Sequence, residues 1–178
     1  MRFKGTLHFY LVALLFTCWI LRPAMATDVI HAEQSEVEAA FLYNFALFTE
    51  WPSLPAKEFR ICVLGSDSVV VALEPVKKRQ IKELPVNVIS ISSATQAQSC
   101  QVLFVGRSEH ASIGKLAKQI GNAPILVVSQ ENGYDPKNVI IALVAQHGRI
   151  TFKINRTAAQ ANSLTVSSKL LKLALQVY

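Results

Sequence analysis

Four short segments rich in apolar and β-branched residues constrain the fold of this 178-residue chain more than any other feature. They lie at 59–64, 86–91, 102–105 and 125–128. Helix-like segments at 66–78 and 111–120 separate them, and Gly121 is expected to end the second helix. Buried apolar strands that alternate with helices are typical of a parallel sheet covered on both faces. We therefore expect a single α/β domain with a mostly parallel sheet of about six strands.

The end of the chain follows a different pattern. The runs 139–145 and 150–154 are joined by His147 and Gly148, a dipeptide that favours a tight turn and so predicts an antiparallel C-terminal hairpin. The second run alternates apolar with polar residues, so one of its faces is expected to meet water at or near the sheet edge. Two more helices are expected after the hairpin. They lie at 156–161, capped by Asn155, and at 168–177, capped by Ser167.

Residues 36–49 are predicted to form a helix with more apolar surface than one sheet face can cover. Phe41, Phe45 and Phe48 fall on one side of it, and Tyr43, Leu47 and the following Trp51 fall on a second side. A helix that covers one sheet face needs a single apolar stripe. We expect the phenylalanines in the core. Tyr43, Leu47 and Trp51 are expected to contact a partner protein or a second copy of the chain in a homodimer.

Residues 1–26 have the three-part layout of a cleavable secretory signal peptide. Arg2 and Lys4 precede an apolar stretch at 7–21, and Ala24 and Ala26 supply the small residues of a cleavage site. The apolar stretch is shorter than the about 20 residues of a membrane span. We expect a periplasmic protein made of residues 27–178, with no direct membrane insertion after cleavage. An uncleaved N-terminal anchor is the alternative.

The net charge of the expected mature chain favours neither nucleic acid nor a membrane surface as a partner. The chain has 18 basic and 12 acidic residues, but three of the basic ones lie in residues 1–26, so a net charge of only +3 remains. The basic cluster of Lys77, Lys78, Arg79 and Lys82 is explained as a solvated loop after a helix.

Two cysteines, Cys62 and Cys100, lie beyond the expected signal peptide. An even number in an oxidising compartment favours a disulfide, with two buried free thiols or a bond between chains as alternatives. If the first strand lies between the second and third, as in many doubly wound sheets, the two residues are within disulfide reach. We predict this disulfide. Neither the cysteines nor the histidines have metal-ligand spacing, so we expect no metal and no cofactor.

The sequence contains no convincing catalytic motif. Residues 65–68 join a strand to a helix, but they hold one glycine and Asp67 would repel a phosphate, so helix capping by Ser66 or Asp67 is the better explanation. Ser108 and His110 lie close together without the glycines that surround a hydrolase nucleophile. We expect that the protein is not an enzyme.

Polar side chains follow three of the predicted strands at their carboxyl ends, where doubly wound sheets bind ligands. This candidate ligand crest contains Asp67, Arg107, Ser108 and Glu109, together with residues 129–131. A small polar solute held by Arg107 is one interpretation of the crest, and three ordinary polar loops are the other.

Four segments in order resemble the YfiR family of periplasmic regulators. They are 39–45 with Trp51 and Pro52, 59–65, 100–105 with 107–109, and 148–155 with the later pairs 158–159 and 167–168. The resemblance covers essentially the whole of residues 27–178.

The resemblance implies an α/β protein of the periplasm without catalytic activity. It implies binding to the periplasmic sensor domain of a membrane-anchored diguanylate cyclase, which is held inactive, so that cyclic-di-GMP and biofilm formation fall. The family's cysteine positions fall on Cys62 and Cys100, and no further cysteine pair is present in residues 27–178. A periplasmic small-solute binding or sensing protein that uses the crest is the alternative function.

Overall fold

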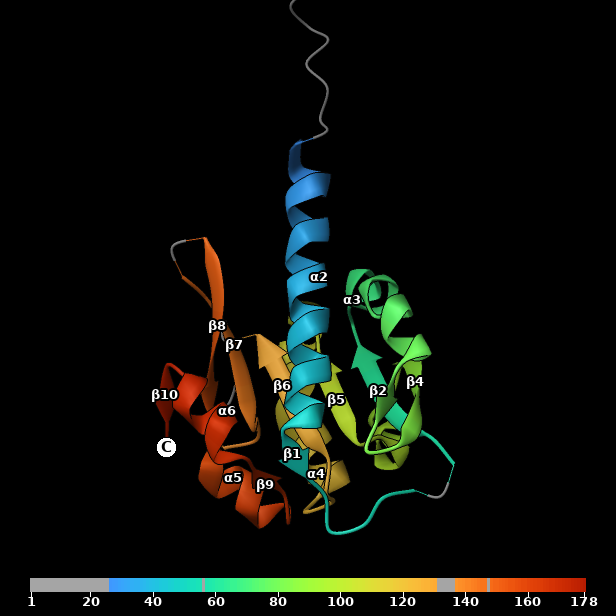
Figure 1. Cartoon of the computed structure of the whole chain (residues 1–178), viewed down its shortest axis with the longest axis vertical. Helices are drawn as coiled ribbons and strands as arrows, with labels where there is room; N and C mark the ends of the chain where they lie inside the picture. Colours follow the sequence, from blue (N-terminus) through green and yellow to red (C-terminus); the bar gives the residue numbers. More distant parts are fainter. Residues whose placement is uncertain (1–25, 56, 131–136, 147) are drawn as a thin grey trace, which may run out of the picture. The chain divides into compact units, whose positions relative to one another are not determined.

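The computed structural model describes residues 26–55, 57–130, 137–146 and 148–178 (Figure 1). Apart from Ala26, the predicted signal peptide lies outside the described residues. The compact unit spans Ala32–Tyr178 and folds as a single α/β domain around an eight-stranded sheet with the order β10-β8-β7-β6-β5-β2-β4-β3. In the part of the chain that is described, no helix has the length and apolar character needed to cross a bilayer.

Parallel pairing holds the centre of the sheet together, as the continuous apolar runs predict. The parallel strands are β2 (Phe59–Leu64), β4 (Leu84–Ile91), β5 (Val102–Val105), β6 (Leu126–Gln130) and β7 (Ile141–Gln146). Ile61 of β2 pairs with Val88 of β4 on one side and with Val102 of β5 on the other. The expected order, with the first predicted strand between the second and third, is confirmed.

The antiparallel hairpin is also confirmed, because β8 (Arg149–Ile154) pairs antiparallel with β7. Gly148 has a φ of 72°, a conformation that suits glycine in a tight turn, and His147 lies outside the described residues. The sheet has more strands than expected because β3 (Gln80–Ile81) and β10 (Gln176–Val177) extend its two edges. Strands of two residues are too short to leave a recognisable pattern in the sequence.

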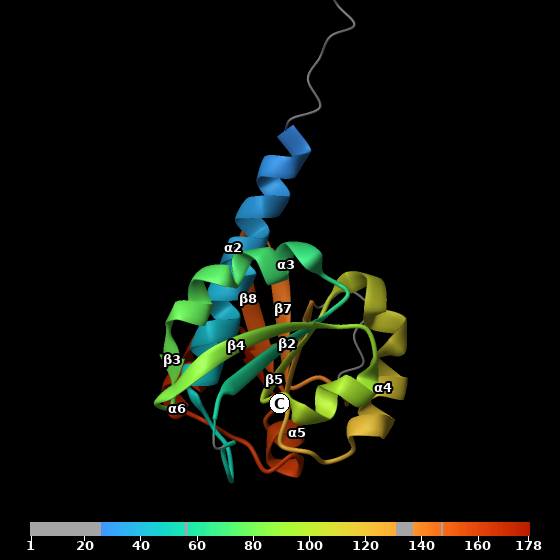
Figure 2. The same cartoon turned by 90° about the vertical axis from the view of Figure 1, so that its right-hand side faces the viewer.

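Helices cover both faces of the sheet (Figure 2). One face packs against α2 (Ala26–Leu47), α3 (Asp67–Ala72), α5 (Arg156–Ala161) and α6 (Ser168–Leu173), and the other against α4 (Ile113–Ile120) and the 3-10 helix Ala94–Ser99. Neighbouring residues of one strand therefore enter different cores. Phe104 packs on the α2 side and Leu103 on the α4 side, as alternation along a strand requires.

The ends of the first and last predicted helices differ from the sequence prediction. Helix α2 stops at Leu47, not at Thr49, because Thr49–Glu50 form strand β1, which pairs antiparallel with β9 (Thr165–Val166). Helix α6 stops at Leu173, not at Val177. The chain after it becomes extended and joins the sheet as β10, where the amide of Leu175 donates to the carbonyl of Phe152 at 2.8 Å.

Local sequence signals explain the other helix boundaries. The expected helix at 66–78 is interrupted, since α3 ends at Ala72 and Pro75 enters a separate 3-10 helix, Glu74–Lys78. The helix expected at 111–120 begins as the 3-10 helix Arg107–Ser112 and continues as α4, which ends at Gly121 with a φ of 56°. The predicted caps of α5 and α6 both form, through the side chains of Asn155 and Ser167.

A disulfide joins Cys62 in β2 to Cys100, two residues before β5, with a Cα–Cα distance of 5.9 Å. Both residues are buried in the core on the α4 side of the sheet. The backbone beside them is paired independently of the sulfurs, because the amide of Gln101 donates to the carbonyl of Arg60 at 3.0 Å.

Candidate functional site

The loops of the candidate ligand crest meet as the topology predicts, but their own contacts fill the space between them. Ser108 Oγ donates to the carbonyl oxygen of Gly65 at 3.0 Å. A Cβ at Gly106 would lie only 2.1 Å from that same oxygen, so the two loops touch backbone to backbone and only glycine fits at this position. Asp67 is exposed at the start of α3. Ser66 occupies the N-cap position but its side chain makes no capping bond, contrary to the capping role expected of it.

Arg107 and Glu109 are held by different neighbours. Arg107 is exposed, and its Nε donates to Gln130 Oε1 at 3.3 Å. Glu109 Oε2 accepts from Ser112 Oγ at 3.0 Å, and Glu131 lies outside the described residues. The cavity beside Arg107 has a volume of about 50 Å³, far below the about 300 Å³ at which small-molecule sites begin. The described crest therefore has the character of three packed polar loops.

A buried carboxylate lies beneath the crest. Glu38 of α2 is only 2% exposed. Its Oε1 accepts from the side-chain amides of Gln130, at 2.6 Å, and Gln34, at 2.8 Å. Such hydrogen bonds compensate for the loss of water around a buried charge. Because Gln130 also accepts from Arg107, this network fastens α2 to the end of β6 and to the crest.

This network was not predicted from the sequence, although the position of Glu38 on the apolar side of α2 could have indicated it. Glu38 lies four residues before Leu42, which is fully buried, and residues four apart share a helix face. An acidic residue on the core-facing side of an apolar helix indicates a buried polar contact, because an unpaired buried carboxylate is costly.

His110 meets a different serine from its sequence neighbour Ser108. Its Nε2 lies 3.1 Å from Ser129 Oγ. Ser129 is fully buried at the end of β6 and also donates to the carbonyl of Gln130. A nucleophile must be reached by its substrate, so this serine–histidine pair is a structural contact that holds the 3-10 helix at 107–112 against the sheet.

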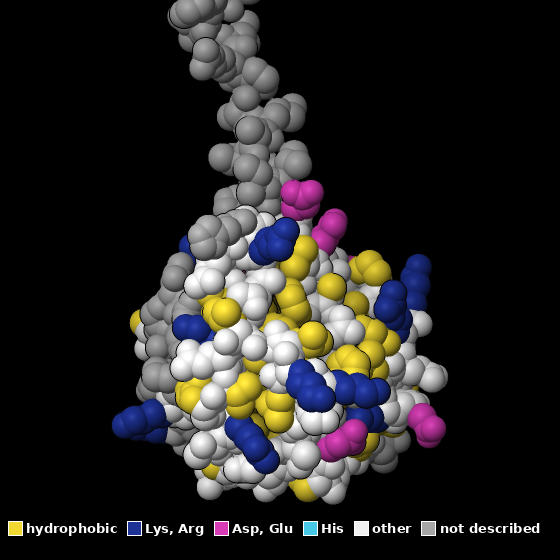
Figure 3. All heavy atoms as spheres, turned by 60° about the vertical axis from the view of Figure 1, so that its left-hand side comes forward, with side chains coloured by type: hydrophobic (Ala, Val, Ile, Leu, Met, Phe, Trp, Pro, Cys, Tyr) yellow, Lys and Arg dark blue, Asp and Glu magenta, His cyan; other side chains and the backbone are white. Residues whose placement is uncertain are grey.

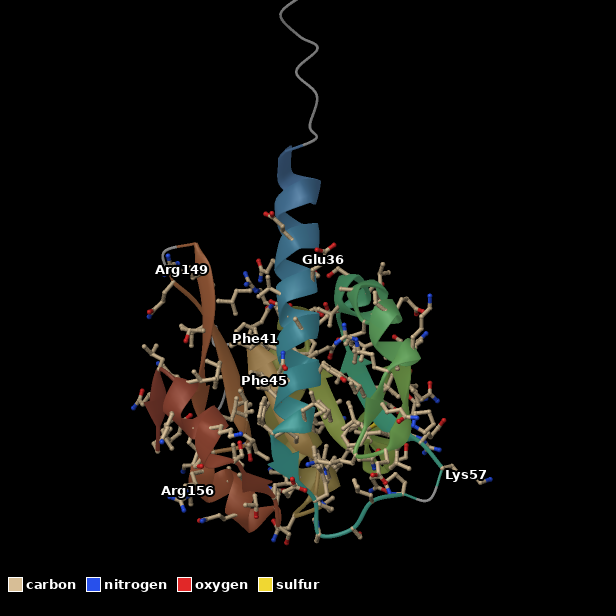
Figure 4. The ribbon with its side chains drawn as sticks, in the orientation of Figure 1. Glu36, Phe41, Phe45, Lys57, Arg149 and Arg156 are labelled. Atoms are coloured by element: carbon tan, nitrogen blue, oxygen red, sulfur yellow. A yellow bond between two sulfur atoms is a disulfide. The ribbon has the colours of Figure 1, made fainter. Side chains whose placement is uncertain are left out.

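A much larger hollow than the one beside Arg107 lies away from the crest, between α2 and the segment formed by α3 and the 3-10 helix after it. Its volume is about 630 Å³, which is within the range of small-molecule sites. Its walls are mostly apolar, and the side chains that form them include Ala39, Ala40, Tyr43, Val71, Pro75 and Val76. Glu36 and Arg79 are the charged residues of the lining, and Glu36 projects from α2 on the α3 side (Figure 4). We call this hollow the α2–α3 groove.

Tyr43 is the predicted contact residue that lines the α2–α3 groove. Its side chain is half-buried, and its hydroxyl donates to the carbonyl of Gln80 at 3.3 Å. The guanidinium of Arg79 lies over its ring, 5.1 Å from the centroid, at a distance typical of a cation–π contact. The ring is thus fixed in place at the edge of an open apolar hollow.

The other two predicted contact residues do not share that position. Leu47 and Trp51 are half-buried and pack against the core on the α2 side. Trp51 meets Phe59 edge to face, with ring centroids 5.1 Å apart, and its buried indole Nε1 has no hydrogen-bond acceptor among the described residues. Tyr43, Leu47 and Trp51 therefore do not form one exposed stripe. Only the accessible part of each side chain is left for a partner.

The opposite side of α2 is fixed to the C-terminal hairpin by an aromatic cluster. The Phe45 ring lies 4.9 Å from that of Phe152 in β8, and the Phe41 ring lies 5.6 Å from it. Figure 4 shows Phe41 and Phe45 on the side of α2 away from Glu36. Phe45 is fully buried, as expected, whereas Phe41 and Phe48 are half-buried at the margin of the same core.

One carboxylate near the start of β2 has a shifted pKa. The hydrogen bond from Arg60 Nε, at 2.7 Å, is the main cause that lowers the pKa of Glu58, and the bond from the Asn87 amide adds to it. This pair is half-buried at the start of β2, away from the crest and the groove. No group of three or more histidine, cysteine or acidic side chains in the described ranges is arranged to hold a metal ion.

Comparisons with known proteins give one matching family and several structural likenesses. The family model described as YfiR/HmsC-like matches residues 35–175. No curated protein sequence matches the chain at a significant level. A conserved domain protein from Vibrio cholerae O1 biovar eltor aligns with a TM-score of 0.51 and 14% identity, over 81% of this chain and 60% of that one. The ABC domain in complex with L-Trp from Streptococcus pneumonia aligns with a TM-score of 0.49 and 13% identity, over 67% of this chain and 55% of that one. The chain thus spans less than two thirds of either structure.

Proposed function

Because this chain belongs to the YfiR/HmsC-like family, we propose that it is a non-catalytic periplasmic regulator. It binds the periplasmic sensor domain of an inner-membrane diguanylate cyclase and holds that enzyme inactive, which lowers cyclic-di-GMP and biofilm formation. The observation that carries the proposal is the family match over residues 35–175, nearly the whole compact unit. Residues 1–26 act as the signal peptide that delivers it, and a disulfide suits an oxidising compartment.

Restraint follows from preferential binding to one state of the sensor. A regulator that binds the inactive conformation more tightly shifts the equilibrium away from the active one, by no more than the difference between its two affinities. A difference of about 2.7 kcal/mol changes the population ratio about a hundredfold. No reaction on the regulator is needed, so an accessible apolar surface matters more than a catalytic group.

The α2–α3 groove is the surface that we assign to this contact. Val71 is 70% exposed at its edge, beside the immobilised ring of Tyr43. Aromatic residues held rigidly in an apolar hollow are typical anchors of protein interfaces, because they lose little conformational entropy on binding. The accessible parts of Leu47 and Trp51, further along the chain, extend the contact in this proposal.

Deletion of the gene tests the proposal. Cyclic-di-GMP should rise in the deletion strain and return to its normal level when the whole chain is supplied. A chain without residues 1–26 should accumulate in the cytoplasm and fail to restore it. Tyr43→Ala should restore it only in part, whereas Arg107→Ala, at an exposed residue that does not line the groove, should restore it fully. Unchanged cyclic-di-GMP in the deletion strain would contradict the proposal.

A small-solute binding protein is the second candidate function, and the size of the α2–α3 groove favours it. The groove, at about 630 Å³, has the volume for a solute that the cavity beside Arg107 lacks. Thermal unfolding in the presence of amino acids, nucleotides and organic acids tests this function. A solute that raises the melting temperature of the wild type but not that of Arg79→Ala would support it, and a shift that depends on Arg107 would return the site to the crest.

A further inference from the structure

The charges of this protein are segregated along the chain. Residues 137–178 contain six basic residues and no acidic one, and all 12 acidic residues of the chain precede residue 136. The small net charge of residues 27–178 hides this separation. Lys169 and Lys172 of α6 and Arg156 at the start of α5 are exposed, and no described carboxylate forms a salt bridge with any of them.

Exposed apolar side chains lie next to these cations. Leu173 is 69% exposed, Leu175 is 50%, Val177 is 41% and Tyr178 is 37% exposed. Leu175 and Val177 lie in and just before β10 (Gln176–Val177), a short edge strand whose two residues are both exposed. Together these four residues make up most of the large apolar side chains that the described unit leaves exposed.

The basic and the apolar residues occupy one face. Lys169 lies three residues before Lys172 and four before Leu173 in α6, so it is a neighbour of both on the outer side of the helix. The amide of Arg156 donates to the carbonyl of Tyr178 at 2.7 Å, which places Arg156 at the end of β10. Figure 3 turns this side of the molecule forward and shows hydrophobic side chains interleaved with lysines and arginines. We call it the C-terminal face.

We propose that the C-terminal face binds peripherally to the anionic headgroups of a phospholipid membrane. Leucine and tyrosine side chains enter the headgroup region while the lysines and the arginine contact lipid phosphates, the arrangement by which amphipathic surfaces lie on bilayers. Lysine stems can cover apolar surface and keep their ammonium groups at the phosphate level. This goes beyond the proposed function, since it concerns a lipid surface and not the cyclase.

The charge pattern favours lipid over the other occupants. A second copy of the chain would bring two faces of the same charge together, which is repulsive. Protein interfaces are depleted of lysine at their centre, whereas here Lys172 directly adjoins Leu173, the most exposed leucine of the face. Residues 156–178, which form this face, contribute basic but no acidic side chains, and the exposed Glu50 beside Thr165 is engaged by Lys82. A predominantly basic surface of this kind fits an anionic one.

Vesicle co-sedimentation of the protein, expressed as the whole chain and purified in the form the cell produces, tests the proposal. Vesicles of phosphatidylglycerol with phosphatidylethanolamine should bind it near 0.1 M ionic strength, and phosphatidylcholine vesicles should not. Binding should fall steeply near 1 M, where the Debye length shrinks to about 3 Å. K169E/K172E should lower partitioning at least about 25-fold, because each lysine at an anionic surface is worth about fivefold.

Two matched variants make the test specific to this face. K77E/K78E makes the same charge change in the basic cluster after α3 and should bind as the wild type does. Leu173→Ser should weaken binding about tenfold, whereas Val71→Ser, at a residue that is equally exposed, should not. Circular dichroism of each variant establishes that it is folded.

Three results would overturn the proposal. The first is no sedimentation with phosphatidylglycerol vesicles at low salt. The second is an equal loss of binding in K77E/K78E, which would mean that overall charge and not this face is responsible. The third is a photocrosslinker at Leu173 that captures the cyclase sensor domain while vesicles fail to bind, which would assign the face to a protein. None of these results depends on whether gene deletion raises cyclic-di-GMP.

Discussion

Reduction of the Cys62–Cys100 disulfide should lower the free energy of unfolding by about 4 kcal/mol. The two residues are 38 positions apart in the sequence, and in the chain-entropy model a loop of that length restricts the unfolded chain by about this amount. The native fold itself needs no crosslink at this point, since β2 and β5 are already paired through their backbones. The cost therefore arises in the unfolded state.

Guanidinium unfolding with and without a reductant measures this difference. In the compact unit, a loss of about 4 kcal/mol should lower the melting temperature by about 8–16 °C. The double variant C62A/C100A is the control, because its stability should not respond to the reductant. A difference below about 1 kcal/mol, or an equal response in the double variant, would refute the reasoning.

Three further predictions concern stability. Gly106→Ala should destabilise the protein by about 1–3 kcal/mol or more in thermal unfolding, because the new Cβ collides with the backbone of the facing loop. Gly114→Ala is the matched control. Its added Cβ meets nothing within 4 Å, so it should be neutral or stabilising in the same measurement. Glu38→Ala should cost about 1–3 kcal/mol in urea unfolding, because it leaves the half-buried amide of Gln130 without its acceptor. Because the pKa of Glu58 is lowered in the folded state, its ionised form stabilises the protein above about pH 4.3, the ordinary pKa of a glutamate, and this stabilisation is lost as the pH falls through the folded-state pKa. Glu58→Gln should therefore make the free energy of unfolding less dependent on pH on the acid side. An NMR titration that finds an unshifted pKa for Glu58 would contradict this prediction.

The parallel centre of the fold could be predicted because its sequence signals are local. Runs such as Phe59–Leu64 are apolar over nearly their whole length, and the glycine after α4 and the caps Asn155 and Ser167 mark helix ends within a few residues. The disulfide prediction depended on one topological assumption, the position of β2 between β4 and β5, and that assumption is confirmed. These features require no knowledge of distant contacts.

The features that were missed are set by distant contacts. The last residues of the chain have helical propensity, yet Gln176–Val177 pair with β8 because a sheet edge is available there; tertiary pairing overrides a weak local preference. The α2–α3 groove combines residues from two separated helices, so no local pattern contains it. Topology predicted that the loops of the crest would meet at one edge of the sheet. It could not predict that the backbones of Gly106 and Gly65 approach so closely that they fill the space between the loops, because that depends on atomic distances.

The β1–β9 ribbon has a consequence for how this chain acquires its structure. Thr49 pairs with Val166, so the end of α2 reaches its strand partner only after residue 166 has been synthesised. Such non-local pairing requires closure of a long loop before any contact compensates for the lost entropy, which slows folding. Until then Phe41 and Phe45 of α2 lack Phe152 of β8, the ring they pack against in the folded protein. Because the chain is made from its N-terminus onward, this apolar helix stays exposed to other proteins until β8 and β9 have been made.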